Sequence, residues 1–250
     1  MSLYESEKGR NMLNLQKSIP PGTQKFIIVS HGFGSSLNSP TSQRALKVFP
    51  ENGFGTIAFD WPGHGKSDSY EDELSVSNCI KYISTVEKNI INENPNAEIF
   101  YFSSSFGAFI NAIYICTQPH RGRKSFFRSG AVNMPKLLKK IPKSKLRCLE
   151  KYGFVMLDEY TPPLKITSKF TEEMRKIDLI DLWTKSGYGY GTKFEMVHGE
   201  KDSTIDVAAA KKFATITSSK ITVFPNGEHR LMDKGEPERV FALAVEFFKS

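Results

Sequence analysis

The chain has 250 residues but only three cysteines, Cys79, Cys116 and Cys148, in an odd number and without paired spacing. This excludes a disulfide framework and a cysteine-rich zinc motif, so we expect reduced thiols and no metal site. The sequence also lacks any run of 18 or more uncharged apolar residues, and its first 14 residues are polar. We therefore expect no transmembrane segment, no secretory signal and a cytoplasmic location.

Internal repeats and low-complexity linkers are absent too, while 39% of the residues are hydrophobic. A chain of this length and composition can bury one sizeable core, so we expect a single domain over residues 1–250. Apolar β-prone runs alternate with stretches predicted to be helical, at 42–52, 73–92, 106–117, 205–217 and 237–249. This alternation is typical of an α/β fold with a mostly parallel central sheet and helices on both faces.

The alternation is interrupted over residues 135–191. This stretch is far longer than an ordinary connection in α/β units, so we predict a small inserted cap. It is expected to contain a basic amphipathic helix over 135–152, a β-hairpin, and a second helix over 168–185 with Ser168 as its N-cap. Ligands of α/β sheets bind beyond the carboxyl ends of the strands, so the cap is expected to form part of the substrate pocket.

A basic segment overlaps the start of this predicted cap. Residues 121–151 contain eleven Lys and Arg side chains and a single acidic one, Glu150, although the whole chain has a net charge of only +7. Such a run can bind an anionic substrate or an anionic surface, or it can be a solvated helix face. Aromatic residues for base stacking are sparse in it, so we do not expect a nucleic acid partner.

The junction of a predicted strand and a predicted helix at 100–107 reads Phe-Tyr-Phe-Ser-Ser-Ser-Phe-Gly. So tight a turn strains the backbone of the residue at its tip, and the residues two positions before and after it must be small. Of the three serines only Ser105 meets this demand, because it is flanked by Ser103 and Gly107. Ser105 is the candidate nucleophile, and a polar loop is the alternative interpretation.

A serine hydroxyl needs a base, and the base needs a group that orients it. In hydrolases with this turn, an acid and then a histidine follow the serine, each after a later strand. One predicted strand ends shortly before Asp202 and another before His229, which makes them the candidate acid and base. The alternatives are that Asp202 starts a helix, that His229 is a surface residue, or that Glu200 or Asp206 is the acid.

Backbone N–H groups are needed to stabilise the oxyanion of such a reaction. We assign them to Phe33, in the loop after a predicted strand over 25–29, and to Phe106, directly after the candidate nucleophile. The loop around Phe33 has a plain glycine turn as its alternative interpretation. Further candidates for substrate binding are His31, Gly32, Ser104 and Tyr160.

Five motifs in this order resemble the α/β-hydrolase family, over nearly the whole chain. They are His31-Gly32-Phe33-Gly34, Asp60-x-Pro-Gly-His-Gly-x-Ser67, Ser103-x-Ser105-x-Gly107, His198-Gly199-x-x-Asp202 and Gly227-x-His229. The resemblance implies the α/β-hydrolase fold. Within the family the chain looks like small esterases of the cinnamoyl-ester and monoacylglycerol-lipase type. The Ser-Ser-Phe-Gly turn and Glu228-His229-Arg230 also resemble acyl-glucuronide esterases and palmitoyl-protein thioesterases, although Ala108 and the region after it depart from both patterns.

Residues and resemblance together predict a serine hydrolase that cleaves carboxylic esters through an acyl-serine intermediate on Ser105. No metal or organic cofactor is expected for this chemistry. The expected partner is a small-molecule acyl ester or thioester. An acyl thioesterase, a lysophospholipase or monoacylglycerol lipase, and a non-catalytic binding protein on the same fold are the alternatives. The sequence does not specify the acyl chain, the alcohol group or the oligomeric state.

Overall fold

A computed structural model of the protein describes residues 4–5, 12–67, 73–134, 142–186 and 189–250. In these residues seven strands form the central sheet, in the spatial order β11 (Lys220–Phe224), β10 (Lys193–Gly199), β7 (Gly122–Arg128), β6 (Glu98–Ser104), β4 (Lys25–Ser30), β5 (Gly55–Phe59) and β3 (Leu15–Ser18). All neighbours are parallel except β3, which pairs with β5 in the antiparallel direction. The predicted mostly parallel sheet is confirmed. Strands β1 (Tyr4–Glu5) and β2 (Met12–Leu13) form a separate small hairpin.

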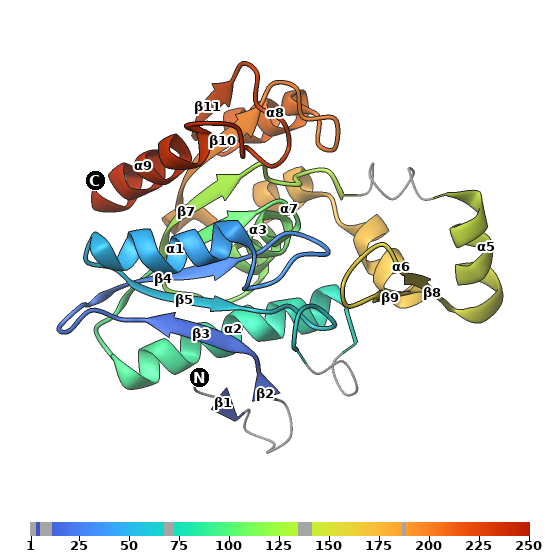
Figure 1. Cartoon of the computed structure of the whole chain (residues 1–250), viewed down its shortest axis with the longest axis horizontal. Coiled ribbons are helices and arrows are strands. Elements are labelled where there is room, and N and C mark those ends of the chain that lie inside the picture. Colours follow the sequence, from blue (N-terminus) through green and yellow to red (C-terminus); the bar gives the residue numbers. More distant parts are fainter. Residues whose placement is uncertain (1–3, 6–11, 68–72, 135–141, 187–188) are drawn as a thin grey trace.

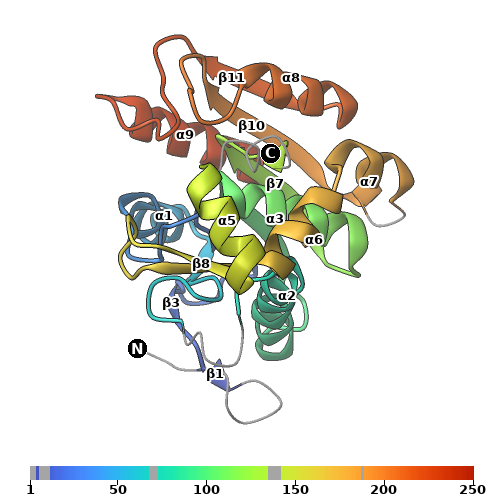
Figure 2. The same cartoon turned by 90° about the vertical axis from the view of Figure 1, so that its right-hand side faces the viewer.

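Helices cover both faces of this sheet, as predicted (Figures 1 and 2). One face packs against α1 (Pro40–Glu51) and α9 (Glu236–Lys249), and the other against α2 (Val76–Glu93), α3 (Phe106–Thr117) and α8 (Val207–Ile216). Each helix lies within a few residues of its predicted range. The strands between them are apolar on both sides, because each face of a covered parallel sheet is buried. Among the described residues, none of the helices is both long and apolar enough to cross a bilayer.

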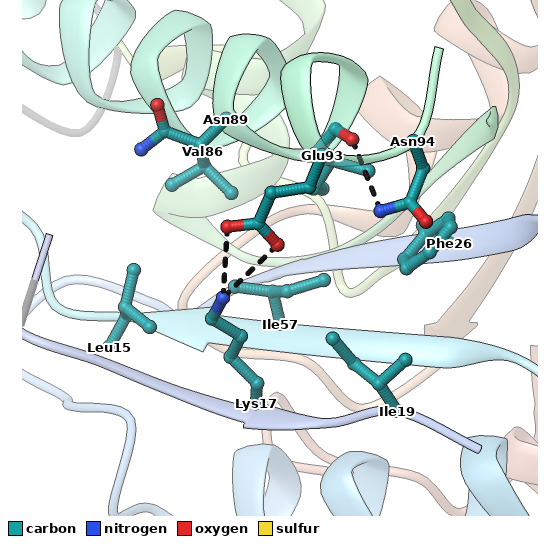
Figure 3. Close-up of a pocket in the computed structure, with 10 residues that line it drawn as sticks. Leu15, Lys17, Ile19, Phe26, Ile57, Val86, Asn89, Glu93 and Asn94 are labelled. Atoms are coloured by element: carbon teal, nitrogen blue, oxygen red, sulfur yellow. Dashed lines mark hydrogen bonds and ion pairs between the residues drawn. The ribbon is translucent and has the colours of Figure 1, made fainter. Parts of the chain in front are cut away.

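Strand β3 is an edge strand that was not predicted from the sequence, because it has only four residues and Leu15 is its one apolar side chain. Lys17, on the same face of the strand as the buried Leu15, ties it to the end of α2, because its Nζ lies 3.4 Å from both carboxylate oxygens of Glu93 (Figure 3). Directly before the strand, Asn14 donates through Nδ2 to Oδ2 of Asp60 at 2.6 Å. The edge strand therefore helps to hold the loop that follows β5.

We call residues 142–186, which lie between β7 and β10, the insertion segment, and the structure describes five elements in it. They are α5 (Lys143–Tyr152), β8 (Phe154–Leu157), β9 (Leu164–Thr167), α6 (Ser168–Lys176) and α7 (Leu179–Lys185). Strands β8 and β9 form the predicted antiparallel hairpin. Figure 1 shows α5, the hairpin and α6 beyond the edge at which the parallel strands end. Residues 135–141 and 187–188 of the predicted cap lie outside the described residues, and Gly189–Gly191 form a short 3-10 turn before β10.

The predicted first cap helix was wrong in its start. Helix α5 begins at Lys143, and Pro142 is its N-cap with φ −57° and ψ 143°. Proline has no N–H and disfavours a helical conformation in the residue before it, so a helix does not run through this position. The predicted residues 135–141 lie outside the described residues.

The predicted second cap helix was wrong as well, because it consists of α6 and α7 with a break between them. Asp178 starts α7 as its N-cap, and its side chain accepts the N–H of Ile180 at 2.8 Å. At the start of α6 the N-cap is Thr167, which accepts the N–H of Phe170 at 3.1 Å. Ser168, the predicted cap, instead donates its hydroxyl to the carbonyl of Leu149. Short polar side chains at neighbouring positions compete for the same N–H groups, and the sequence alone does not show which of them becomes the N-cap.

Candidate active site

Ser105 lies at the tip of the turn between β6 and α3, with φ 49° and ψ −114°. A positive φ is strained for any residue with a Cβ atom, and such strain persists only where the surroundings fix it. Backbone hydrogen bonds do so. The Ser105 N–H donates to the carbonyl of Arg128 at 3.0 Å, and the Ser105 carbonyl accepts from Ala108 at 3.0 Å and from Ala131 at 3.1 Å.

The flanks of this turn are as tight as the sequence analysis requires. Ser103 is fully buried in the sheet. A Cβ atom on Gly107 would lie 2.7 Å from the carbonyl oxygens of both Ser30 and His31, so no larger residue fits there without moving the backbone of β4. The hydroxyl of Ser105 is therefore presented at the carboxyl end of the sheet by close contact between backbones.

The structure brings Ser105, His229 and Asp202 together. His229 Nε2 lies 3.0 Å from Oγ of Ser105, and His229 Nδ1 lies 2.7 Å from Oδ2 of Asp202. They come from the carboxyl ends of β6, β11 and β10, which all point to the same edge of the parallel sheet. The rival acids lie elsewhere: Asp206 is the N-cap of α8, and Glu200 is exposed.

The carboxylate of Asp202 is held in its charged form. Burial disfavours the charge, but hydrogen bonds from His198, from His229 and from the Ile205 N–H outweigh it and lower the pKa of Asp202 well below its usual value. The second oxygen, Oδ1, accepts the N–H groups of Thr204 at 2.9 Å and Ile205 at 2.8 Å. A charged carboxylate on one side of His229 makes Nδ1 the protonated nitrogen, so Nε2 has its lone pair free for the Ser105 hydroxyl.

His198 is a residue of this site that the sequence analysis did not identify. Its side chain is buried, and its Nε2 lies 3.1 Å from Oδ2 of Asp202 and 3.1 Å from the carbonyl oxygen of Ile205. The sequence did contain an indication of its role, because His198 begins the motif His198-Gly199-x-x-Asp202, which ends at the candidate acid.

The predicted oxyanion donors, Phe33 and Phe106, lie close together near the turn of Ser105, since their ring centres are 5.7 Å apart. Phe106 is the first residue of α3, where helical N–H groups have no intrahelical acceptor. In the part of the chain that the structure describes, neither the Phe106 N–H nor the Phe33 N–H donates to a protein acceptor. The loop of Phe33 lies against the nucleophile, since a Cβ atom on Gly32 would lie 3.3 Å from Cβ of Ser105.

His31, a predicted substrate contact, has no free ring nitrogen. Nδ1 lies 2.8 Å from the carbonyl of Gly32, and Nε2 accepts the N–H of Trp61 at 3.2 Å. Burial lowers the pKa of His31 to about 4, so the ring is neutral at neutral pH. Its imidazole joins the loops after β4 and β5. Of the other predicted contacts, Gly32 lies beside Ser105, and Ser104 is 6% exposed at the end of β6.

Tyr160, the remaining predicted contact, connects the insertion segment to the loop of Phe33. Its ring centre lies 5.6 Å from that of Phe33. From α6, the ring of Phe170 lies 6.4 Å from Phe33 and 6.1 Å from Phe106. Side chains of the insertion segment thus contact the rings of Phe33 and Phe106. Within the described ranges, no three His, Cys, Asp or Glu side chains are grouped as they would be around a metal ion.

Comparison with known proteins places this geometry in a family. A family model, Hydrolase_4, described as "Serine aminopeptidase, S33", matches residues 21–181. The chain belongs to this α/β-hydrolase family. The match includes Ser105 and Phe33, whereas Asp202 and His229 lie beyond it. A search by sequence among curated proteins finds no match.

Solved structures of other α/β hydrolases are similar over the whole chain. Est1E from Butyrivibrio proteoclasticus, in its ferulic acid-bound structure, has a TM-score of 0.81 at 19% identity and covers 100% of both chains. Mouse alpha/beta hydrolase domain-containing protein 10 has a TM-score of 0.78 at 17% identity and covers 99% of this chain and 98% of its own. Monoacylglycerol lipase from Paleococcus ferrophilus has a TM-score of 0.72 at 19% identity, with 94% and 98% covered. At these identities the likeness shows the fold, and it confirms the predicted α/β-hydrolase architecture.

Proposed function

We propose that this α/β hydrolase cleaves carboxylic esters of small molecules through an acyl-serine intermediate. The observation that carries the proposal is the unbroken series of contacts from Ser105 Oγ through His229 to the buried carboxylate of Asp202, at 3.0 and 2.7 Å. A surface histidine or a helix-capping aspartate has no reason to make these contacts with a serine in a strained turn.

The reaction follows from these positions. His229 Nε2 takes the proton of Ser105 as Oγ forms a bond with the ester carbonyl carbon, and the N–H groups of Phe33 and Phe106 stabilise the resulting oxyanion. Collapse of this intermediate breaks the bond to the alcohol, which leaves with the proton from Nε2. Water then attacks the acyl-serine with the same base, releasing the carboxylic acid and restoring the serine hydroxyl. Asp202 orients the imidazole and stabilises its positive charge.

Aromatic side chains around Ser105 support an apolar acyl or aryl group as substrate. The rings of Phe33, Phe106, Tyr160 and Phe170 form one connected cluster that joins the turn of Ser105 to the insertion segment. Est1E with its ferulic acid and the monoacylglycerol lipase share the fold, which favours the same substrate class here. We propose that the insertion segment forms a cap over the active site. We also propose that the enzyme is cytoplasmic.

Labelling with a fluorophosphonate probe and turnover of p-nitrophenyl acetate test the nucleophile. Replacement Ser105→Ala should abolish labelling and lower turnover by about 10⁴-fold or more. Ser144→Ala, on the exposed face of α5, is the matched control and should behave like the parent protein. A folded Ser105→Ala protein that keeps its turnover would refute the proposal, and absence of labelling in the parent protein would favour a binding protein.

The choice of acid and the substrate class need separate measurements. Asp202→Asn should lower turnover strongly, whereas Glu200→Gln changes an exposed carboxylate two residues away and should not. A panel of p-nitrophenyl esters, acyl-coenzyme A thioesters and amino-acid p-nitroanilides of matched acyl size then separates esterase, thioesterase and aminopeptidase activity. Preference for the anilides would overturn the ester assignment while leaving the nucleophile in place.

A further inference from the structure

Arg128 is a buried cation whose guanidinium has no direct partner among the described residues. It is the last residue of β7, its side chain points to the face of the sheet covered by α1 and α9, and the residue is only 8% exposed. Within the described residues its guanidinium makes no hydrogen bond and no ion pair. Burial lowers the pKa of Arg128 to about 10, so the group is still charged at neutral pH. Glu236 partly offsets this charge through space without a direct contact, and a buried cation with no hydrogen-bonded partner is unfavourable.

The guanidinium faces a small cavity. The cavity has a volume of about 70 Å³ and lies between Arg128, the first turn of α1 and the start of α9. A cavity of about 10–15 Å³ is enough for one water molecule, so this one has room for a small polyatomic ion. Leu231 and Phe241 supply apolar wall, and Met232, which is 46% exposed, lies where the cavity reaches the surface.

Among the described residues that line this cavity, two are cationic and none is acidic. Arg44 of α1 lines it opposite Arg128, and Arg230 adds a further positive charge that acts on Arg128. Of the nearby acidic groups, Glu238 accepts from Nη1 of Arg44 at 2.7 Å, while Glu236 accepts the N–H of Asp233 at 3.0 Å and also acts as an opposite charge on Arg128. Thr41, also in the lining, belongs to the first turn of the 12-residue helix α1, whose N-terminal end favours negative charge.

We propose that this cavity binds a small oxyanion, the phosphate or carboxylate group of a metabolite or the free ion. The planar guanidinium of Arg128 would take two of its oxygens, a geometry that arginine forms with both groups. Arg44 and the hydroxyl of Thr41 contact it from the opposite wall. Leu231 and Met232 belong to the turn that carries His229, so the bound anion joins this turn to the sheet and to α1.

The experiment is a titration of the full chain with inorganic phosphate. Binding is measured by calorimetry and by thermal unfolding, and sodium chloride at equal ionic strength is the reference. The parent protein should bind phosphate saturably, and its Tm should rise by about 3 °C at ten times the Kd. Arg128→Met should weaken binding by at least about tenfold, because the bidentate contact is lost. Arg175→Gln removes an exposed cation of α6 and should bind like the parent protein.

Arg44→Gln provides a second test that does not touch the buried strand, since this side chain is 38% exposed. It should also weaken binding, and Arg128→Met itself should unfold no more easily than the parent protein without phosphate. Acetate and glycerol phosphate, titrated in parallel, separate a carboxylate site from a phosphate site and a free ion from an esterified one. Absence of saturable binding of all three anions, or unchanged binding in both variants, would overturn the proposal. Because no turnover is measured, this outcome is independent of the esterase assignment.

Discussion

The Nε2 atom of His198 lies 3.1 Å from Oδ2 of Asp202, the same carboxylate oxygen that receives Nδ1 of His229 at 2.7 Å. Two imidazoles therefore approach one oxygen, while the N–H groups of the loop hold the other oxygen. His198 is buried at the end of β10, where it cannot rotate away. We interpret it as a positioning residue: its N–H fixes the rotamer of Asp202, which in turn fixes the plane of His229.

Replacement of His198 should therefore lower kcat and leave KM nearly unchanged. For His198→Leu we expect a loss of about tenfold in kcat, corresponding to about 1.4 kcal/mol from one charge-assisted hydrogen bond. His198→Gln, whose amide nitrogen reaches a similar position, should recover most of it. Steady-state kinetics of both variants with one p-nitrophenyl ester gives the comparison. Equal losses in both, or a change confined to KM, would speak against positioning and for a general packing defect.

The sequence predicted those parts of the site that depend on local chain geometry. Ser105 was identifiable because it is the one serine of the three with small residues two positions before and after it. The structure shows the reason at Gly107, where a Cβ atom would meet the backbone of β4. Asp202 and His229 were identifiable because each follows a strand in a set order. Contacts between side chains of distant segments could not be predicted from the sequence.

Three of the missed features show why. The role of His198 depends on the direction in which the side chain of Asp202 points in the folded protein. That Arg128 has no direct partner among the described residues depends on what α1 and α9 place around it, and no pattern within β7 encodes that. Edge strand β3 gains its stability from pairing with β5, since four residues with a single apolar side chain are too weak a signal by themselves.

Ser103 gives a second prediction, about the tolerance of the turn. Its side chain is fully buried, and its hydroxyl has no hydrogen-bond partner among the described residues. Ser103→Gly and Ser103→Ala should thus keep the activity and change the free energy of unfolding little. Ser103→Leu should destabilise the protein by about 1–3 kcal/mol through overpacking, and lower turnover by displacing Ser105. Urea unfolding together with ester turnover checks this, and a fully active Ser103→Leu protein would contradict the tight-turn argument.

A third prediction concerns acid stability. Burial lowers the pKa of His31 to about 4, and burial together with the nearby His31 lowers that of His64 to about 3, both from an ordinary value of 6.5. Both rings are neutral in the folded protein and take up protons more readily when unfolded. Their contribution is fully present above pH 6.5 and is lost as the pH falls toward 4 and 3.

At pH 5 the loss should be about 2 kcal/mol for each of these two groups. Urea unfolding at pH 7, 6 and 5 measures it, in a range where most carboxylates do not yet titrate. His64→Asn retains a donor near Nδ1, which lies 3.0 Å from the carbonyl of Pro62. This variant should be less stable at pH 7 but lose about half as much stability between pH 7 and pH 5. A pH dependence identical to that of the parent protein would show that His64 does not titrate on unfolding.

The last prediction separates backbone strain from contact with the insertion segment. Gly34 has φ +68°, and a Cβ atom there would overlap the ring of Tyr160. Gly22 has nearly the same conformation, φ +73°, with open space around it. Gly22→Ala should therefore cost only the strain of a positive φ, about 1–2 kcal/mol. Gly34→Ala should cost more, because Tyr160 must move, and should also raise KM if the insertion segment contacts the substrate.

In a Tyr160→Ala background the overlap no longer exists, so the cost of Gly34→Ala should fall to that of Gly22→Ala. Urea unfolding of the single and double variants gives the coupling energy between the two positions. If Gly34→Ala cost the same with and without the tyrosine ring, the contact between the Phe33 loop and the insertion segment would carry no energy. A coupling accompanied by a change in KM would instead mean that this contact sets how the cap lies over Ser105.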